Sequence, residues 1–457
     1  MRLHDNPALH AALAHGAVIP LFILDPAILN TRWHRAAIRR REFLLAGLRS
    51  LDRALRSVGS RLLVRSGEPV IVLGSLVAES GATAIYAVED FSPYARRRDA
   101  AVQTVLPLTL TDGVTVHHPA WIQRKQGGPY TVFTPFYRAW RAWPMPRDEE
   151  ILDPPRRLAS VPSALSSEPL PPTATMNRFE ASETEAHRRL AAFVTDSIYE
   201  YGVARDVLAR EGTSTLSPYL RFGLLSPRNA VVTALRALGA ATDEVARQSA
   251  ETWLKELVWR EFYVQVMYHF PQVLRQAFNP RLREIAWRDD PEHLAAWRYG
   301  KTGFPIVDAC MRQLLTTGWM HNRGRMIAAS FLVKDLLIDW RVGEAWFMQH
   351  LIDGDPAANN GGWQWTAGVG TDAAPYFRIF NPVTQGQKFD PEGTFIRRYV
   401  PELAKLPTEH IHTPWRMTAL EQTMQGVQIG DTYPAPIVDR AQLKARTLAA
   451  YRGKGDG

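Results

Sequence analysis

The sequence predicts an α/β amino-terminal part built on a Rossmann-like parallel sheet, followed by a larger all-α part. Three observations predict it. Short apolar or β-branched runs alternate with helical stretches over the first 125 residues, and strand signals nearly vanish from about Ser182 onward. Such alternation favours a parallel sheet covered by helices. A length of 457 residues also exceeds the size at which single cores stop growing, so two domains are expected.

Four strands and a long helix are expected in the amino-terminal part. The helix is an Ala-, Leu- and Arg-rich stretch at residues 39–58. Apolar runs bounded by turn residues are typical of parallel strands. The expected strands are residues 18–24, 61–64, 84–88 and 114–117.

Residues 144–175 differ in composition from their surroundings, being rich in Pro and Ser with pairs at Pro154-Pro155 and Pro171-Pro172. This composition indicates an irregular linker that runs over the surface. We therefore expect an α/β domain at residues 1–125, an interdomain linker at 126–181 and an all-α domain at 182–457.

Long helices are predicted in the all-α domain at residues 251–269 and 325–340. In the second, Lys334, Asp335 and Asp339 form a polar stripe beside apolar residues such as Phe331 and Leu332. This pattern predicts one amphipathic helix.

The composition points to phosphate recognition in a reducing compartment. The net charge of +8 and pI near 9.6 come mostly from Arg, whose planar donor group suits phosphates, although a general preference for Arg in the source would look the same. The single cysteine, Cys310, excludes a disulfide framework, a Cys-x-x-Cys zinc site and a four-cysteine iron–sulfur cluster, and no metal site is predicted. Since apolar runs of about 18 residues and a signal-peptide pattern are absent from the sequence, we expect a soluble, cytoplasmic protein.

A helix entry is predicted at residues 211–220. Ser217 is a good N-cap and Pro218 suits the first helical position, so residues 213–217 form the preceding turn. Amides and hydroxyls at such an entry bind phosphate well. An ordinary capped helix is the simpler explanation of this motif taken alone.

One face of the helix at residues 251–269 carries a second motif. Trp253, Glu256 and Arg260 fall within about 60° of one another at 3.6 residues per turn, whereas Trp259 is turned towards a neighbouring surface. The alternative is a surface ion pair between Glu256 and Arg260, and such pairs contribute little.

Residues 318–381 place amide, guanidinium, carboxylate and indole groups within apolar helical segments. Burying such groups without partners is costly, so their density predicts a polar ligand, such as a large heterocyclic cofactor, inside the helical domain. Asn322, Arg325 and Met326 project to one side of their helix, with Arg323 on the adjacent flank. The Gly and Asp content of residues 353–365 is typical of a plain loop.

These motifs resemble the photolyase/cryptochrome family, and most of all its bacterial class I members that act on cyclobutane pyrimidine dimers. The resemblance spans nearly the whole chain, from RLHDNPA at residues 2–8 through TSTLSP at 213–218 and residues 253–263 to TQG at 384–386. It implies a light-driven carbon–carbon lyase that repairs dimers in DNA by electron transfer from excited, reduced, non-covalently bound FAD.

The resemblance also implies which residues contact FAD. The turn at residues 213–217 matches the family's pyrophosphate-binding turn, while Asp353 and Asp355 match carboxylates that bind the sugar alcohol and ring edge. Asn359 matches the residue beside the redox-active flavin nitrogen, where an uncharged amide helps to keep the fully reduced anion accessible. The implied cofactor-binding residues are Tyr201, Thr213, Ser214, Thr215, Leu216, Ser217, Trp253, Glu256, Arg260, Asn322, Arg325, Asp353, Asp355 and Asn359.

Catalytic and DNA-binding roles follow from the same resemblance. Glu256 lies between flavin and substrate, and the indoles of Trp287, Trp340 and Trp363 relay an electron from the surface to oxidised flavin. Core packing is the alternative for Trp340. Together with Asn359, these residues form the implied catalytic set. The implied contacts to DNA are Arg205, Trp259, Arg323, Met326, Trp365 and Arg378.

A cryptochrome-type blue-light receptor and a (6-4) photolyase are the alternative functions, and a helical nucleic-acid-binding protein is the fallback without the resemblance. Asn359 favours repair, because plant cryptochromes tend to have Asp and insect ones Cys there. Met326 favours the cyclobutane dimer, because (6-4) enzymes commonly have His. Damaged DNA is the expected partner, with no membrane and no protein partner, and the expected state is a monomer associated with the nucleoid when bound to DNA.

The antenna chromophore stays open between methenyltetrahydrofolate, a deazaflavin and none. Residues 114–124 lack the acidic residue that folate-binding relatives use, and Leu274 stands where those relatives have Lys.

The amino terminus departs from the family pattern. Relatives begin with an apolar strand and a Trp-Phe-Arg-x-Asp-Leu-Arg stretch, whereas this chain opens at Met1 directly on the Arg-Leu-His-Asp-Asn motif. A strand with its turn, about ten residues, is therefore expected to be missing from the sheet. We favour a misassigned start site, and predict that residues 19–24 and 85–88 flank the gap.

Overall fold

A computed structural model describes residues 1–29, 37–173, 178–375 and 377–452, except for the side chains of residues 441, 442 and 444. The chain divides into two compact units. The first unit comprises Met1–Gly202, Thr213–Pro271 and Ile352–Ala357, and the second comprises Val203–Gly212, Gln272–Leu351 and Ala358–Gly457.

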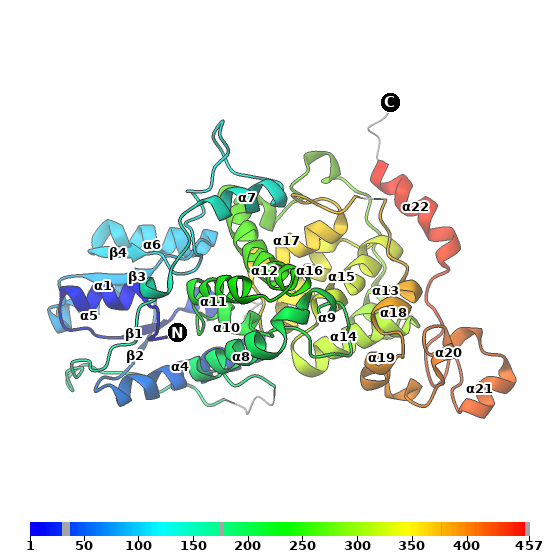
Figure 1. Ribbon diagram of the computed structural model, residues 1–457, viewed down its shortest axis with the longest axis horizontal. Coiled ribbons are helices and arrows are strands. Elements are labelled where there is room, and N and C mark those ends of the chain that lie inside the picture. Colours follow the sequence, from blue (N-terminus) through cyan, green and yellow to red (C-terminus); the bar gives the residue numbers. More distant parts are fainter. Residues whose placement is uncertain (30–36, 174–177, 376, 453–457) are drawn as a thin grey trace. The chain divides into compact units, whose positions relative to one another are not determined.

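Four short parallel strands of the first unit form two two-stranded sheets (Figure 1). β1 (Leu21–Leu24) pairs with β2 (Leu63–Ser66), and β3 (Ile85–Val88) pairs with β4 (Leu108–Thr111). The parallel pairing and the intervening helices confirm the α/β amino-terminal part that the alternating pattern predicts.

Helices surround these strands and continue through the rest of the first unit. Several begin at capping side chains: Asn6, Ser92 and Ser182 each accept an amide of the first helical turn. The 20-residue α4 confirms the helix predicted at residues 39–58. The helices are α1 (Pro7–His15), α2 (Pro26–Leu29), α4 (Ile38–Ser57), α5 (Pro69–Ser80), α6 (Pro93–Val105), α7 (Phe133–Ala142), η1 (Asp148–Glu150), α8 (Glu183–Asp196), η2 (Ile198–Glu200), α10 (Ser217–Arg221), α11 (Pro227–Ala240) and α12 (Glu244–His269), while α9 (Tyr201–Ala204) crosses the unit boundary.

The strand predicted at residues 114–117 is wrong, and the strand lies at β4 instead. The amides of Val116 and His117 donate to the two carboxylate oxygens of Glu261, at 2.5 and 3.5 Å. A buried side chain therefore takes the place of a neighbouring strand. Both segments alternate apolar and polar residues, so the pattern alone does not distinguish them.

The regular elements among the described residues of the second unit are helices, apart from one isolated bridge between Ile429 and Tyr433. Its core gathers around α14 and α15, with Val307, Leu314 and Ile327 buried. The elements are η4 (Pro280–Leu282), α13 (Pro291–Arg298), α14 (Pro305–Thr317), α15 (Asn322–Ser330), η5 (Phe331–Asp335), α16 (Trp340–His350), α18 (Pro382–Phe389), α19 (Thr394–Tyr399), η6 (Pro401–Leu403), α20 (Thr408–Ile411), η7 (Pro414–Arg416), α21 (Ala419–Gln425) and α22 (Arg440–Arg452), while η3 (Pro271–Leu274) and α17 (Pro356–Ala367) begin in the first unit and continue into the second.

The continuous amphipathic helix predicted at residues 325–340 is wrong. α15 ends at Ser330, a π-helical turn follows, and the backbone leaves the helix at Leu337, whose φ is 55°, before α16 begins. Lys334 and Asp335 are buried, with 1% exposure each. Lys334 donates to the Ala367 carbonyl at 2.8 Å, and Asp335 accepts from Arg440 at 2.6 Å. The sequence pattern alone does not show whether such polar side chains face solvent or are buried with partners inside the protein.

Two smaller predictions also need correction. Residues 353–365 do not form a plain loop, because α17 begins at Pro356 and Asp355 caps the amide of Ala357 at 2.9 Å. α10 begins at Ser217 itself, with Leu216 as its N-cap.

The Pro- and Ser-rich segment is irregular over residues 144–173 apart from η1, while residues 174 and 175 lie outside the described part. None of the helices in the described part of the chain combines the length and apolar character needed to span a bilayer.

Candidate functional site

α12 presents three predicted site residues along one face in the first unit. Trp253 is buried, and its Nε1 donates to the Ser214 hydroxyl at 3.4 Å. Arg260 donates to the Val114 carbonyl at 2.7 Å, and Glu256 is half-buried. Asp243 caps this 26-residue helix, which holds the three side chains at the predicted helical spacing.

The turn before α10 brings hydroxyl groups close to that face. Thr215 has a φ of 50°, in the left-handed region, and its hydroxyl accepts from Arg189 at 2.8 Å. Leu216 is buried and anchors the turn, whereas Thr213 is half-buried and Ser217 is exposed. The turn therefore offers hydroxyl and amide groups from a fixed backbone.

The aromatic side chains of Tyr201, Phe193 and Trp253 pack together beside this face of α12. Tyr201 is buried and meets Phe193 edge to face at 5.7 Å, and Phe193 contacts the Trp253 ring at 5.1 Å. Trp259, on another side of α12, is half-buried and packs against Phe133.

Two carboxylates and two guanidinium groups form a charge-balanced cluster in the first unit. Arg221 Nε lies 3.7 Å from Asp355 Oδ2 and donates to the Gly354 carbonyl at 3.1 Å. Burial lowers the pKa of Arg40 to about 10, with repulsion from Arg221 adding to it and attraction by Asp353 and Asp355 opposing it. These charges fix the segment that carries both predicted cofactor carboxylates.

α15 carries four predicted residues in the second unit. Arg323 pairs with Asp206 at 2.6 Å, lies 3.7 Å from the sulfur of Met326 and sits 4.3 Å from the Phe389 ring centroid. Arg325 turns back to donate to the Met320 carbonyl at 2.9 Å. Asn322 is the first residue of the helix.

The α15 N-cap is a buried neutral imidazole. His321 accepts the Arg323 amide at 3.1 Å, and burial lowers its pKa to about 4. The helix start that carries Asn322 is therefore held without an added charge.

Asn359 is fixed by the neighbouring helix α16. Its side-chain amide donates to the Glu344 carbonyl at 3.1 Å, and the Asn360 amide donates to the Glu344 carboxylate at 3.1 Å. Burial raises the pKa of Glu344 to about 7. With its amide nitrogen bound to the protein, Asn359 keeps its side-chain oxygen in a set orientation.

The three predicted relay indoles belong to one hydrophobic cluster of the second unit. Trp340 and Trp363 are buried in it, with 1% and 2% exposure, and Trp287 packs against it. Trp363 contacts Phe347 at 4.9 Å and Trp297 at 6.1 Å, and Trp287 meets Tyr451 edge to face at 6.0 Å.

The indole nitrogen of Trp363 is buried and has no hydrogen-bond partner among the described residues. Gly343 makes room for this ring, because a Cβ there would lie 2.1 Å from Trp363 Cη2. Burying an N–H group without a partner is costly, so a polar ligand atom at this position would be stabilising. The Trp346 nitrogen is also buried without a partner among the described residues, so this feature does not by itself identify a ligand site.

The remaining predicted DNA contacts are more exposed than the relay indoles Trp340 and Trp363. Arg205 and Trp365 are half-buried, and Arg378 is exposed with its guanidinium 5.8 Å from the Phe380 ring centroid. Exposure suits contacts to a large polyanion more than it suits a structural role.

Several residues around the site are absent from the sequence predictions. Phe133, Arg40 and Arg221 act from elements distant in sequence, so no local pattern links them to α12 or Asp355. Asp206 directly follows Arg205, and this alternation of charge is the one signal that could have identified it.

The chain matches known protein families along most of its length. A family model described as DNA photolyase matches residues 1–155, and one described as the FAD binding domain of DNA photolyase matches residues 253–453. The chain is 40% identical to the deoxyribodipyrimidine photo-lyase of Agrobacterium fabrum, covering 99% of this chain and 95% of that protein. It is 41% identical to the Escherichia coli protein of the same name, covering 100% and 98%.

Solved structures of a photolyase and of a cryptochrome both resemble this chain along nearly its whole length. A bacterial class III photolyase from Agrobacterium tumefaciens superposes with a TM-score of 0.92 at 39% identity, covering 99% of this chain and 95% of that one. A cryptochrome from Synechocystis superposes with a TM-score of 0.89 at 32% identity, covering 98% and 96%.

Proposed function

Because the chain belongs to the DNA photolyase family, we propose that it repairs cyclobutane pyrimidine dimers in DNA by light-driven electron transfer from FAD. The observation that carries this proposal is the similarity to deoxyribodipyrimidine photo-lyases over the full length of both chains. Asn359 and Met326 support repair of the cyclobutane dimer over signalling or (6-4) repair.

The side chains present fit FAD. In the first unit, the hydroxyls of Thr213, Ser214 and Ser217 would bind its phosphates, and Asp353 and Asp355 would bind its hydroxyl and ring-edge groups. In the second unit, Asn359 holds an amide oxygen in a set orientation, and the buried Trp363 nitrogen lacks a partner among the described residues. When bound in its reduced form, FAD supplies the photochemistry that splits the cyclobutane ring.

Trp253 and Arg260 would border the cofactor from the ordered face of α12, with Tyr201 and Leu216 packed behind them. Asn322 and Arg325 would do the same from the start of α15. Each set is held by contacts within its own unit, which reduces the ordering cost of binding.

DNA would be held first by its phosphates. Arg205, Arg323 and Arg378 supply positive charge, which makes binding dependent on salt. The dimer would be flipped out of the helix, at lower cost than a normal pair because the lesion already disrupts stacking. Trp259 would stack on the flipped bases, with Met326 and Trp365 completing the apolar contacts.

Glu256 would hydrogen-bond the dimer while the dimer carries the extra electron, which slows unproductive electron return. Trp363, Trp340 and Trp287 would pass an electron inward to restore the reduced cofactor. Their membership of one cluster supports this role.

The organisation of the protein follows from the same proposal. We place an antenna-type α/β domain at residues 1–125, a linker at 126–181 and a catalytic helical domain at 182–457. The family matches at residues 1–155 and 253–453 support this order. The protein would act as a monomer without protein partners, in the cytoplasm and on the nucleoid.

A further proposal concerns the sheet, which would hold an additional strand between β1 and β3. Two observations support it. β1 pairs with β2 and β3 with β4, and the described residues show no pairing between the two sheets. A pocket of 1030 Å³ is lined by Phe22 of β1 and by Ile85, Tyr86 and Ala87 of β3. An apolar extended segment would fill this space and pair with both open edges.

Adding such a segment ahead of Met1 tests the sheet proposal. An apolar strand sequence should raise the melting temperature, whereas a Gly- and Ser-rich extension of equal length should not. Equal melting temperatures for the two extensions would refute it.

Illumination of the purified, reduced protein tests the proposed function. One DNA oligonucleotide carries a single cyclobutane thymine dimer and another a (6-4) lesion at the same position. We expect the first to be restored in blue light and neither in the dark. Protein that binds reduced flavin but restores no cyclobutane dimer in light would refute the proposal, and restoration of the (6-4) lesion alone would reassign the substrate.

A further inference from the structure

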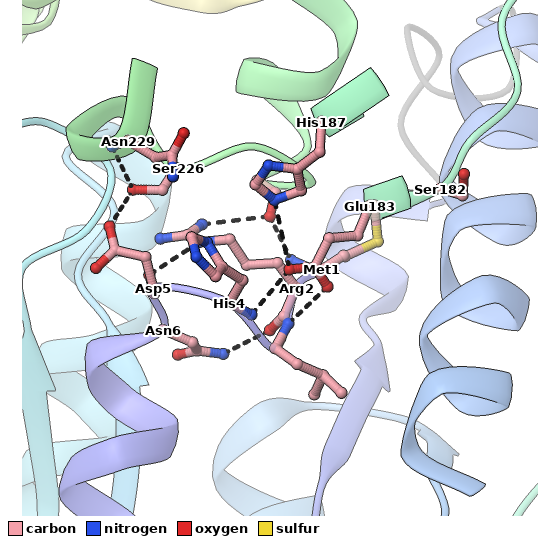
Figure 2. A network of polar contacts seen from close by, with 12 residues as sticks. Met1, Arg2, His4, Asp5, Asn6, Ser182, Glu183, His187, Ser226 and Asn229 are labelled. Carbon is pink, nitrogen blue, oxygen red and sulfur yellow. Dashed lines mark hydrogen bonds and ion pairs between the residues drawn. The ribbon is translucent and has the colours of Figure 1, made fainter. Parts of the chain in front are cut away.

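Three metal-ligating side chains gather in the first unit at the start of α8 (Figure 2). Glu183 and His187 are one helical turn apart on α8, and His4 lies in the segment before α1. One potential ligand atom from each of the three lies within 4.8 Å of the other two. We propose that His4, Glu183 and His187 bind a divalent transition-metal ion of the zinc class.

The backbone holds the carboxylate in place. The two oxygens of Glu183 accept the amides of Leu3 and His4, each at 2.8 Å, as Figure 2 shows. Ser182 caps α8 by accepting the amide of Glu185 at 3.0 Å. A carboxylate oxygen has two lone pairs, so Glu183 can hold these amides and still bind a cation. The segment before α1 is therefore fixed to the helix that supplies the other two ligands.

The imidazoles of His4 and His187 have ring nitrogens that could bind a metal ion. Their ring centroids lie 4.9 Å apart with the planes at 86°, and His187 Nε2 lies 4.0 Å from a Glu183 oxygen. His4 Nδ1 is buried and has no hydrogen-bond partner in the described part of the chain. Because an unpartnered buried nitrogen is costly, a metal bond at this position would remove an existing penalty.

The surrounding charge is compatible with a cation. Arg2 and the Met1 ammonium both interact with Glu183 and are cationic groups that oppose a dication here. The Arg2 donors are directed to backbone carbonyls, at 3.0 Å to Asp5 and 3.2 Å to Gly223, and the ammonium donates to the Gly223 carbonyl at 3.1 Å. Glu183 supplies a compensating negative charge.

A pocket of 330 Å³ completes the site. It is lined by all three proposed ligands together with Leu51 and Pro154, and it can supply a water as a fourth ligand. Two imidazoles, one carboxylate and an open position are a donor set that suits zinc. Bonds of about 2.0–2.1 Å put tetrahedral ligands about 3.3 Å apart. The ligand atoms lie within 4.8 Å of one another, so side-chain rotations that bring them closer by up to about 1.5 Å would close the site. Such an ion would fasten the segment before α1 to α8, independently of any repair reaction.

Zinc binding to the full-length, flavin-containing, untagged protein tests this proposal. After treatment with a chelator and dialysis, the wild type should take up one Zn²⁺ per chain in isothermal titration calorimetry. His4→Ala and His187→Ala should each weaken binding by at least the roughly tenfold that loss of a supporting second-shell group costs. His15→Ala, which removes an exposed imidazole from the same unit, should bind like the wild type.

Circular dichroism and flavin absorbance identify any variant that does not fold. Anomalous scattering at the zinc edge from wild-type crystals provides a readout that needs no variant, with the peak expected among the three side chains. Absence of stoichiometric binding, a peak elsewhere, or unchanged affinity in folded His4→Ala and His187→Ala would overturn the proposal.

Discussion

The indole of Trp259 lies flat against the phenyl ring of Phe133, with ring centroids 3.8 Å apart and planes 6° from parallel. Phe133 begins α7 and is buried, whereas Trp259 is half-buried on α12. Phe262 meets both rings nearly at right angles. One face of the indole is thus covered by protein, which fixes its plane. In the proposed function, the opposite face stacks on a base.

Replacing Phe133 should weaken recognition of damaged DNA. Phe133→Leu keeps an apolar side chain but loses the flat contact, which is worth about 0.5–1.5 kcal/mol for an aromatic pair. We expect the Kd for dimer-containing DNA to rise about 2- to 10-fold and the Kd for undamaged DNA to stay unchanged. Fluorescence anisotropy measures both. Phe136→Leu is the matched control on α7, and equal affinities of Phe133→Leu and wild type for the lesion would contradict the prediction.

Replacing Trp363 should separate cofactor reduction from repair. Trp363→Phe loses an oxidisable indole but no hydrogen bond to the described residues, so folding should be retained. Light-driven reduction of oxidised flavin, followed by absorbance, should fall to near zero, while chemically reduced protein should still repair. Trp346→Phe is the control, because that indole nitrogen is also buried without a partner in the described part. Loss of repair by reduced Trp363→Phe would contradict the relay role.

The pair of Arg323 and Asp206 should regulate the strength of DNA binding. Removing one phosphate contact by Arg323→Gln should lower affinity at low salt and reduce the slope of log K against log salt by about 0.9. Asp206→Asn should have the opposite effect on affinity, because it releases the guanidinium from a 2.6 Å ion pair. The Arg312 and Glu402 pair, at 2.7 Å, gives matched controls in Arg312→Gln and Glu402→Gln. Identical salt slopes for Arg323→Gln and wild type would exclude a phosphate contact.

Stability should depend on pH through Lys334. Burial lowers its pKa to about 7, while the unfolded side chain titrates near 10.4. Between these values the unfolded chain binds a proton that the folded chain does not, so the free energy of unfolding should rise with pH, by up to about 1.4 kcal/mol per unit. Urea unfolding followed by Trp fluorescence at pH 7.5 and 9 measures this rise.

Lys334→Met should flatten the pH dependence, since Met carries no titrating group. Lys388→Met, which removes an exposed lysine from the same unit, should keep the wild-type rise. The same slope in Lys334→Met and wild type would show that another group titrates.

The sequence predicted those features that depend on residues close together in the chain, such as a helix and the spacing of side chains along it. The helical pattern predicted residues 251–269, which lie within α12, and the spacing of Trp253, Glu256 and Arg260 follows from helical geometry. The first seven residues of α12 and its cap Asp243 lie outside the predicted range. The sequence could not show that Val116 and His117 bind Glu261, which lies far along the chain and removes the predicted strand. It also could not show that Lys334 and Asp335 are buried, because their partners Ala367 and Arg440 belong to distant elements.

The same distinction between local and long-range features applies to the candidate functional site. Residue types at the proposed cofactor positions could be assigned from motifs, because a motif preserves chemistry at a given sequence position. The supporting contacts could not, because Phe133, Asp206 and Arg40 reach their partners only through tertiary packing.

The π-helical turn at Phe331–Asp335 has a consequence for how this region can vary. A π turn corresponds to one residue inserted into an α-helix. Deleting one residue there would restore ordinary winding and rotate everything that follows by about 100° relative to α15. Trp340 would then leave its packed position, and Lys334 would lose the Ala367 carbonyl. The number of residues between Ser330 and Trp340 is thus more tightly constrained than their identities. Deleting one residue there should destabilise the fold more than most substitutions do.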